Sequence, residues 1–204
     1  MTTHASSPVV LRNGIDIDDP LRVVLGFLEA YRRFDAGDRS RPAAFGEADL
    51  RLANRGGARI SALEIAAVLE RRRAIERALR AIAPHASLTE AAGEVPWPAL
   101  RQLFDGFADL RGVGFSKVTK ALHPKRPALV PILDSVVQRH LVEDDLGLRA
   151  PFGERALGLI RGYKRDLDRN RVALRAARHE LARRGYELTD VRILDVLIWS
   201  VETA

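Results

Sequence analysis

A segment near the middle of the chain has the residue types needed to hold a phosphate group. Residues 110–122 read Leu-Arg-Gly-Val-Gly-Phe-Ser-Lys-Val-Thr-Lys-Ala-Leu, which predicts a helix end, a Gly-Val-Gly turn and a new helix. Gly112 and Gly114 let the backbone turn tightly and approach a ligand, and the first amides of the next helix suit a phosphate oxygen. Lys117 and Lys120 are three positions apart, so they share one helix face and attract a polyanion. The segment predicts contact with a nucleic-acid backbone.

The residues around this turn complete the predicted interface with duplex DNA. Val113 is apolar, and we expect it to fold back into the hairpin against Leu110 and Leu122. An ordinary turn between two helices would use the same Gly-Val-Gly sequence, and this alternative stays open. The residues that we expect at the DNA interface are Arg111, Gly112, Val113, Gly114, Ser116, Lys117, Lys120, Lys125, Arg126 and Arg139.

The basic residues are concentrated in one part of the chain. Residues 110–184 carry 17 Lys/Arg against 8 Asp/Glu, a net charge of +9, whereas the rest carries 16 against 19, a net charge of −3. Only four of the 33 basic residues are lysines, so an Arg-rich genome alone would explain the total charge of +6. The asymmetry is more informative, because it predicts one basic face for a polyanion.

The hairpin and the aspartate that follows it resemble the helix-hairpin-helix DNA glycosylase superfamily, which includes endonuclease-three-like and 8-oxoguanine glycosylases. The hairpin of that superfamily reads Leu-x-Gly-Val-Gly, and its catalytic aspartate follows at a nearly fixed distance. In this chain Asp134 lies 20 residues after Gly114. Ser135, Val137 and Arg139 then follow, similar to the superfamily's small hydroxyl residue, aliphatic residue and Arg.

The motifs that carry the resemblance lie within about residues 100–141. Outside this range only the arrangement of helices on both sides of the hairpin is similar. Residues 119–122 and 125–127 are most similar to bacterial proteins with an 8-oxoguanine glycosylase fold and to an uncharacterised actinobacterial family. The resemblance implies an all-α fold in which two helical lobes surround a cleft, with Asp134 at its mouth.

The resemblance also implies a reaction. Asp134 would activate water and stabilise the cationic sugar that develops as an N-glycosidic bond breaks. Ser116 stands where the bifunctional members have a Schiff-base lysine, with Lys117 one place later, which implies a monofunctional glycosylase without lyase activity. Three alternatives remain: Asp134 serves only as a helix N-cap, the protein is a non-catalytic helix-hairpin-helix DNA-binding protein, or it is a helical interaction domain with no nucleic-acid role.

The composition excludes several classes of site. The 204 residues include no cysteine, which rules out disulfides, thiolate zinc sites, iron–sulfur clusters and cysteine nucleophiles. The five histidines lack metal-ligand spacing, so we expect no metal and no cofactor. With no secretory leader and no apolar stretch of about 18 residues, we expect a cytoplasmic protein without membrane contact.

Apolar residues at helical spacing predict the elements of the all-α fold. Residues 1–17 lack such a pattern and are expected to be a flexible arm, followed by a single helical domain over residues 18–204. Trp97 and Trp199 are expected in the core, and residues 129–133 form an extended connector around Pro131. The expected helices cover residues 18–37, 61–84, 97–110, 134–141, 154–168, 172–184 and 189–201.

Overall fold

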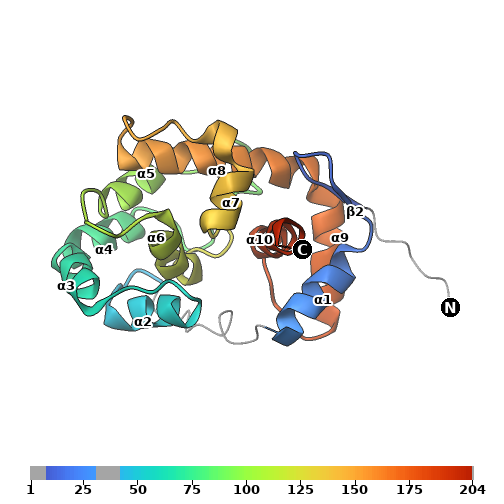
Figure 1. Cartoon of the computed structure of the whole chain (residues 1–204), viewed down its shortest axis with the longest axis horizontal. Helices are drawn as coiled ribbons and strands as arrows, with labels where there is room; N and C mark the ends of the chain where they lie inside the picture. The colour runs from blue at the N-terminus through green and yellow to red at the C-terminus, as the bar shows by residue number, and fades with distance from the viewer. Residues whose placement is uncertain (1–7, 31–41, 204) are drawn as a thin grey trace.

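The computed structural model describes residues 8–30 and 42–203, and this part of the chain is mostly helical (Figure 1). The all-α class is confirmed, with two short strands as the only addition within the described residues. The strands are β1 (Val9–Val10) and β2 (Asp16–Ile17). The α-helices are α1 (Pro20–Ala30), α2 (Glu47–Arg55), α3 (Ala62–Glu70), α4 (Arg72–Arg80), α5 (Trp97–Asp105), α6 (Phe115–Leu122), α7 (Ser135–His140), α8 (Phe152–Arg169), α9 (Arg171–Arg183) and α10 (Asp190–Glu202), and two 3-10 turns are η1 (His123–Lys125) and η2 (Val142–Asp144).

The helices form two groups that are joined by the long helix α8. The first group contains α2 to α6, and the second contains α1, α9, α10 and the strands; α8 runs along both, and α7 lies between them (Figure 1). Helix α8 packs on α5 in the first group and on α9 and α10 in the second. No helix in the described part of the chain has both the length and the apolar character needed to cross a bilayer.

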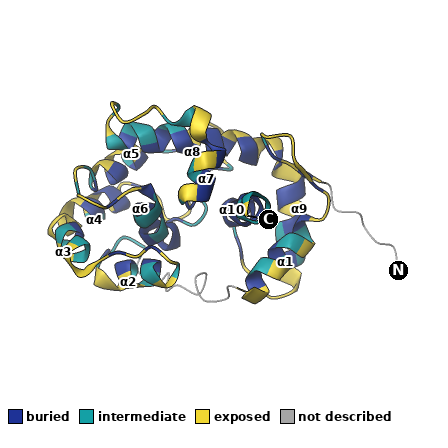
Figure 2. Cartoon of the chain, viewed as in Figure 1, coloured by how far each residue is buried: buried dark blue, intermediate teal, exposed yellow. Residues whose placement is uncertain are grey.

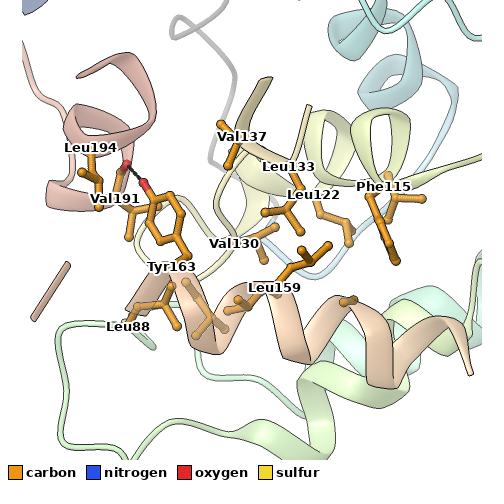
Figure 3. Packing of buried hydrophobic residues seen from close by; sticks show 14 of the residues in the cluster. Leu88, Phe115, Leu122, Val130, Leu133, Val137, Leu159, Tyr163, Val191 and Leu194 are labelled. Atoms are coloured by element: carbon orange, nitrogen blue, oxygen red, sulfur yellow. Dashed lines mark hydrogen bonds between the residues drawn. The ribbon is translucent and has the colours of Figure 1, made fainter. Parts of the chain in front are cut away.

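Buried apolar side chains form one continuous core across both groups. Figure 2 shows the buried residues on the inward faces of the helices and the exposed residues on the outside. Leu122, Leu133 and Leu159 are fully buried and lie together where α6 and the connector pack over α8 (Figure 3). The Tyr163 hydroxyl of α8 donates to the Val191 carbonyl of α10 at 2.6 Å, which fixes α10 against α8 (Figure 3).

Most expected helices are confirmed, with two differences in the first group. Of the helix expected over residues 18–37, the structure shows α1 (Pro20–Ala30), and residues 31–37 lie outside the described part. Residues 61–84 were expected to form one helix, but the chain turns at Arg71, so α3 and α4 are separate. The turn lets Ile75 and Leu79 of α4 reach the core, where both are fully buried. A capping box of Ser61 and Glu64 begins α3. Helix α2, which follows a segment without a strong apolar period, was missed.

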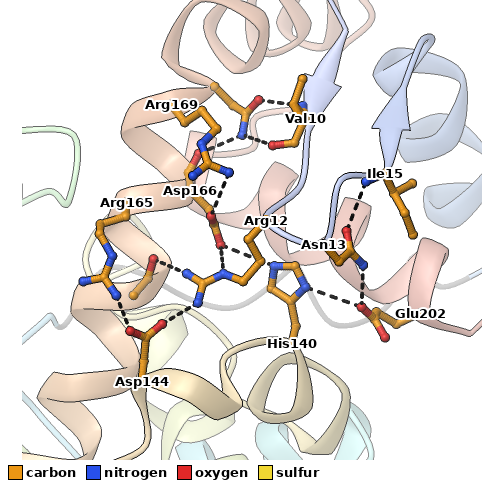
Figure 4. A network of polar contacts seen from close by, with 12 residues as sticks. Val10, Arg12, Asn13, Ile15, His140, Asp144, Arg165, Asp166, Arg169 and Glu202 are labelled. Atoms are coloured by element: carbon orange, nitrogen blue, oxygen red, sulfur yellow. Dashed lines mark hydrogen bonds and ion pairs between the residues drawn. The ribbon is translucent and has the colours of Figure 1, made fainter.

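The N-terminal segment corrects the expectation of a flexible arm for residues 8–17, whereas residues 1–7 lie outside the described part. Strands β1 and β2 pair antiparallel, and Val9 and Leu11 are buried in the core. The Asn170 side chain receives the Val10 N–H at 2.8 Å and donates to the Val10 carbonyl at 2.9 Å (Figure 4). Val9 and Leu11 alternate with exposed or half-buried residues, a strand pattern too short to stand out in the sequence.

A buried polar network attaches the β1–β2 strand pair to the rest of the fold (Figure 4). The Arg12 guanidinium donates to Asp166 at 2.7 Å and also pairs with Asp144. The His140 ring, at the end of α7, lies 3.3 Å from Asp166 and 3.4 Å from Glu202 of α10. Burial alone would raise the pKa of Asp166, but the hydrogen bonds from His140 and Arg12 hold it below its usual value. The network therefore connects the β1–β2 strand pair with α7, α8 and α10.

Candidate pocket and nucleic-acid interface

The connector that precedes α7 is held in place from two sides. The Leu133 N–H donates to the Thr119 hydroxyl of α6 at 3.0 Å, and the Ile132 N–H donates to the Asp195 carboxyl of α10 at 3.1 Å. Leu133 is fully buried, while Ile132 and Asp134 both line a pocket. This is the alternation expected of extended backbone, in which residues two apart share a face. Helices α6 and α10 together fix the position of Asp134.

Asp134 caps α7 with one of its two carboxylate oxygens. The Val136 and Val137 amides both donate to Oδ1 at 3.0 Å, so the N-cap alternative is confirmed as a structural role. Within the described residues, Oδ2 accepts no hydrogen bond. The side chain is half-buried and lines the pocket. Capping therefore leaves one oxygen of Asp134 available to a ligand.

The pocket lies between the two helix groups and has a volume of about 610 Å³. Its walls come from α1, the end of α2, α6, the connector, α7 and α10. This volume falls within the range of about 300–1,000 Å³ that is typical of small-molecule sites. A single nucleobase could be accommodated there.

One wall of the pocket is aromatic. The rings of Phe27 and Trp199 meet edge to face, with centroids 5.5 Å apart and an interplanar angle of 75°. The Arg192 guanidinium lies over the Phe27 ring, with its central carbon 5.3 Å from the ring centroid. Trp199, which was expected in the core, is only half-buried and faces the pocket, so that expectation is wrong. This wall offers both ring surfaces and a cation.

The charged groups of the pocket shift one another's pKa values. Burial lowers the pKa of Lys120, and Arg192 lowers it further, while Asp134 opposes both. Burial raises the pKa of Asp195 to about 8, although Arg192 and the hydrogen bonds from Ile132 and Tyr163 oppose the rise. Burial therefore favours the protonated form of Asp195, whose carboxyl lines the pocket together with that of Asp134.

The hairpin is formed largely as expected. Helix α5 ends at Asp105, earlier than predicted, and turns lead to Gly112, whose φ of +79° favours glycine. Val113 is buried and its N–H donates to the Leu110 carbonyl at 3.1 Å, which confirms that it folds back into the hairpin. Gly114 begins α6, and a Cβ added there would meet open space. A ligand can therefore approach the backbone at Gly114.

The exposed part of the predicted DNA interface is smaller than the sequence suggested. Arg111, Gly114 and Arg139 are exposed, as is Gly112. Ser116, Lys117 and Lys120 are half-buried, and of these Lys120 faces the pocket.

A carboxylate neutralises one of the hairpin lysines. The Lys117 ammonium donates to Glu64 of α3 at 2.6 Å. The same carboxylate lies against Gly112, where an added Cβ would collide with it. Lys117 is therefore not an unpaired cation at this turn.

Two predicted DNA contacts are wrong, because their side chains are buried. Lys125 pairs with Asp49 at 2.8 Å, and 6% of its side chain is exposed. Arg126 is 1% exposed and donates to backbone carbonyls. Its acceptors are the carbonyls of Pro42, Leu79, Ile82 and Lys125, at 2.6–2.8 Å. Both residues join α2 and α4 to the segment after α6, so they stabilise the fold rather than contact DNA.

Sequence reasoning missed most of the pocket lining, including the two aromatic residues and two of its charged residues. Phe27, Trp199, Arg192 and Asp195 all lie in apolar helical patterns that are typical of the core. One signal was present: Arg192 and Asp195 interrupt the run Val-Arg-Ile-Leu-Asp-Val-Leu-Ile, and charged residues are rarely buried without a partner or a function. No group of three or more potential metal ligands occurs among the described residues.

Comparison with known proteins gives one family match. The model of a family of unknown function, DUF6308, matches residues 27–202. The chain belongs to this family. Searches of the curated proteins and of the solved structures find no match. The matched region begins at Phe27 and extends past Trp199, so it contains every residue that lines the pocket.

Proposed function

We propose that this protein binds duplex DNA and hydrolyses the N-glycosidic bond of a base held in the pocket, as a monofunctional DNA glycosylase with a helix-hairpin-helix glycosylase fold. The observation that carries the proposal is the position of Asp134. Its Oδ1 caps α7, while its Oδ2 accepts no hydrogen bond from the described residues and the side chain lines a pocket of about 610 Å³. One carboxylate can thus cap the helix and act on a substrate.

The pocket has the chemistry that an extruded base requires. Proteins that act on a base in duplex DNA take it out of the stack and hold it between apolar or aromatic side chains and polar groups. Phe27 and Trp199 supply ring surfaces, and Lys120 and Asp195 supply polar atoms. An aspartate in this position would face the positive charge that develops on the sugar.

The hairpin supports approach of the DNA backbone. Lys117 and Val118 donate their amides to the Gly114 carbonyl, so the helix hydrogen bonds begin at that carbonyl. The open space at Gly114 and the exposed Arg111 suit a phosphate group. Thr119 on the same helix accepts a hydrogen bond from the connector that carries Asp134. The helix proposed to contact the DNA backbone therefore also positions the proposed catalytic residue.

The test is base release from a panel of duplexes that carry oxidised, alkylated, deaminated or mismatched bases. We expect the wild-type protein to release at least one of them, and Asp134→Asn to slow release by about 10²-fold or more, since Asn caps the helix but lacks the charge. Ser135→Ala, at the exposed neighbouring position, is the matched control and should release base at the wild-type rate.

The outcomes separate the proposed function from its alternatives. Salt-sensitive duplex binding without release of any base would show a non-catalytic DNA-binding protein. Absence of duplex binding at low salt would favour a helical interaction domain. Equal rates for the wild type and Asp134→Asn would show that Asp134 is only a helix cap.

A further inference from the structure

Asp195 is a second acid in the same pocket, and its burial favours the protonated form. Its carboxyl receives the Ile132 N–H at 3.1 and 3.3 Å and also bonds with Tyr163. The Tyr163 contact, the Ile132 N–H and Arg192 favour the carboxylate, and the nearly complete burial of Asp195 outweighs them.

Asp195 and Asp134 lie in contrasting environments although they share one pocket. Ile132, which bonds to Asp195, and Asp134 lie on the same side of the extended connector. Asp195 is 2% exposed, whereas Asp134 is half-buried and receives two backbone amides on one oxygen. In glycoside hydrolysis, two carboxyls in such different surroundings take different roles, one as the acid and the other as the base.

We propose that Asp195 is the general acid that protonates the leaving base, while Asp134 is the carboxylate that faces C1′ of the sugar. This inference rests on the proposed function and adds a second catalytic residue to it. The C1′–N bond breaks with its electron pair on the base, and the Asp195 proton moves to a ring nitrogen. A water oxygen bonds to C1′ and gives its proton to Asp134. Solvent then reprotonates Asp195 and takes the proton from Asp134.

The charges around Asp195 predict the pH range of this role. Arg192 faces it from α10, Tyr163 from α8 and Asp134 from the connector. Burial outweighs Arg192 and raises the pKa of Asp195 to about 8. The rate of release of a neutral base should therefore fall as the pH rises through this value.

The test compares leaving groups that differ in their need for a proton. The probes are duplexes with 7-methylguanine, which is already cationic, and duplexes with the neutral bases that the wild-type protein releases. In Asp195→Asn, we expect release of the neutral base to slow by about 10²–10⁴-fold and to lose its fall near pH 8. Release of 7-methylguanine should change by less than about threefold, whereas Asp134→Asn should slow both. Asp190→Asn changes a buried carboxyl of the same helix outside the pocket and should change neither.

The possible failures are distinguishable. Equal slowing of both leaving groups in Asp195→Asn would show a structural role, and no slowing would show that Asp195 is not the acid; either result leaves the proposed function intact. If the wild type releases only neutral bases, a pH profile that is identical in Asp195→Asn overturns the inference. If the wild type releases no base, the proposed function and this inference fall together.

Discussion

The buried carboxyl of Asp195 should make the stability of the fold depend on pH in a way that one substitution removes. Between the unfolded pKa of 3.8 and the folded pKa of about 8, the unfolded chain has lost this proton while the folded chain keeps it. Folding then takes up a proton, so the contribution of Asp195 to stability is present at low pH and is lost as the pH rises toward 8. The slope is about 1.4 kcal/mol per pH unit.

The magnitude follows from this slope over a window that lies between the two pKa values. From pH 5 to pH 7, the free energy of unfolding of the wild type should fall by about 2–3 kcal/mol relative to Asp195→Asn. The difference between the two proteins cancels the other titrating groups, and urea unfolding at each pH measures it. If the difference in free energy of unfolding between the two proteins changes by less than about 0.5 kcal/mol from pH 5 to pH 7, Asp195 is ionised in the folded protein and the reasoning is refuted.

Three further predictions concern the interface and the fold. Arg126→Met should destabilise the protein by about 3 kcal/mol or more in urea unfolding, because buried carbonyls lose their donors; a near-neutral effect would contradict the buried role. Gly112→Ala should cost about 1–2 kcal/mol because of its positive φ and the Glu64 contact, whereas Gly114→Ala should cost less than about 0.5 kcal/mol; equal costs would contradict this. Glu64→Gln should tighten duplex binding by about threefold or more, since it frees Lys117, and Glu70→Gln on the same helix should not; identical affinities would place DNA elsewhere.

The sequence predicted the helices whose apolar residues recur over three or more turns. Helices α8, α9 and α10 lie within two residues of their expected bounds. The hairpin was predicted because Gly112 and Gly114 are local signals. Helix α2 and strands β1 and β2 were missed, because they are short and their burial depends on residues far away in the chain.

The candidate site was only partly predictable for a related reason. Asp134 could be found because its distance from the hairpin is a property of the sequence. The burial of Arg126 could not, because its acceptors include carbonyls of α4 that come near only in the folded chain. The pocket likewise joins Phe27 to Trp199 across most of the chain, so no local pattern indicated it.

The central claim is that a base is removed inside the pocket that Asp134 lines. The most direct measurement is single-turnover base release by Ala30→Trp, on the duplex that the wild type cleaves fastest. Ala30 is an exposed residue of the pocket lining, so a tryptophan there adds bulk at the pocket without replacing a core residue. We predict that release slows by about tenfold or more while duplex affinity changes by less than about twofold. Release at the wild-type rate would contradict the account, because the reaction would then take place outside this pocket.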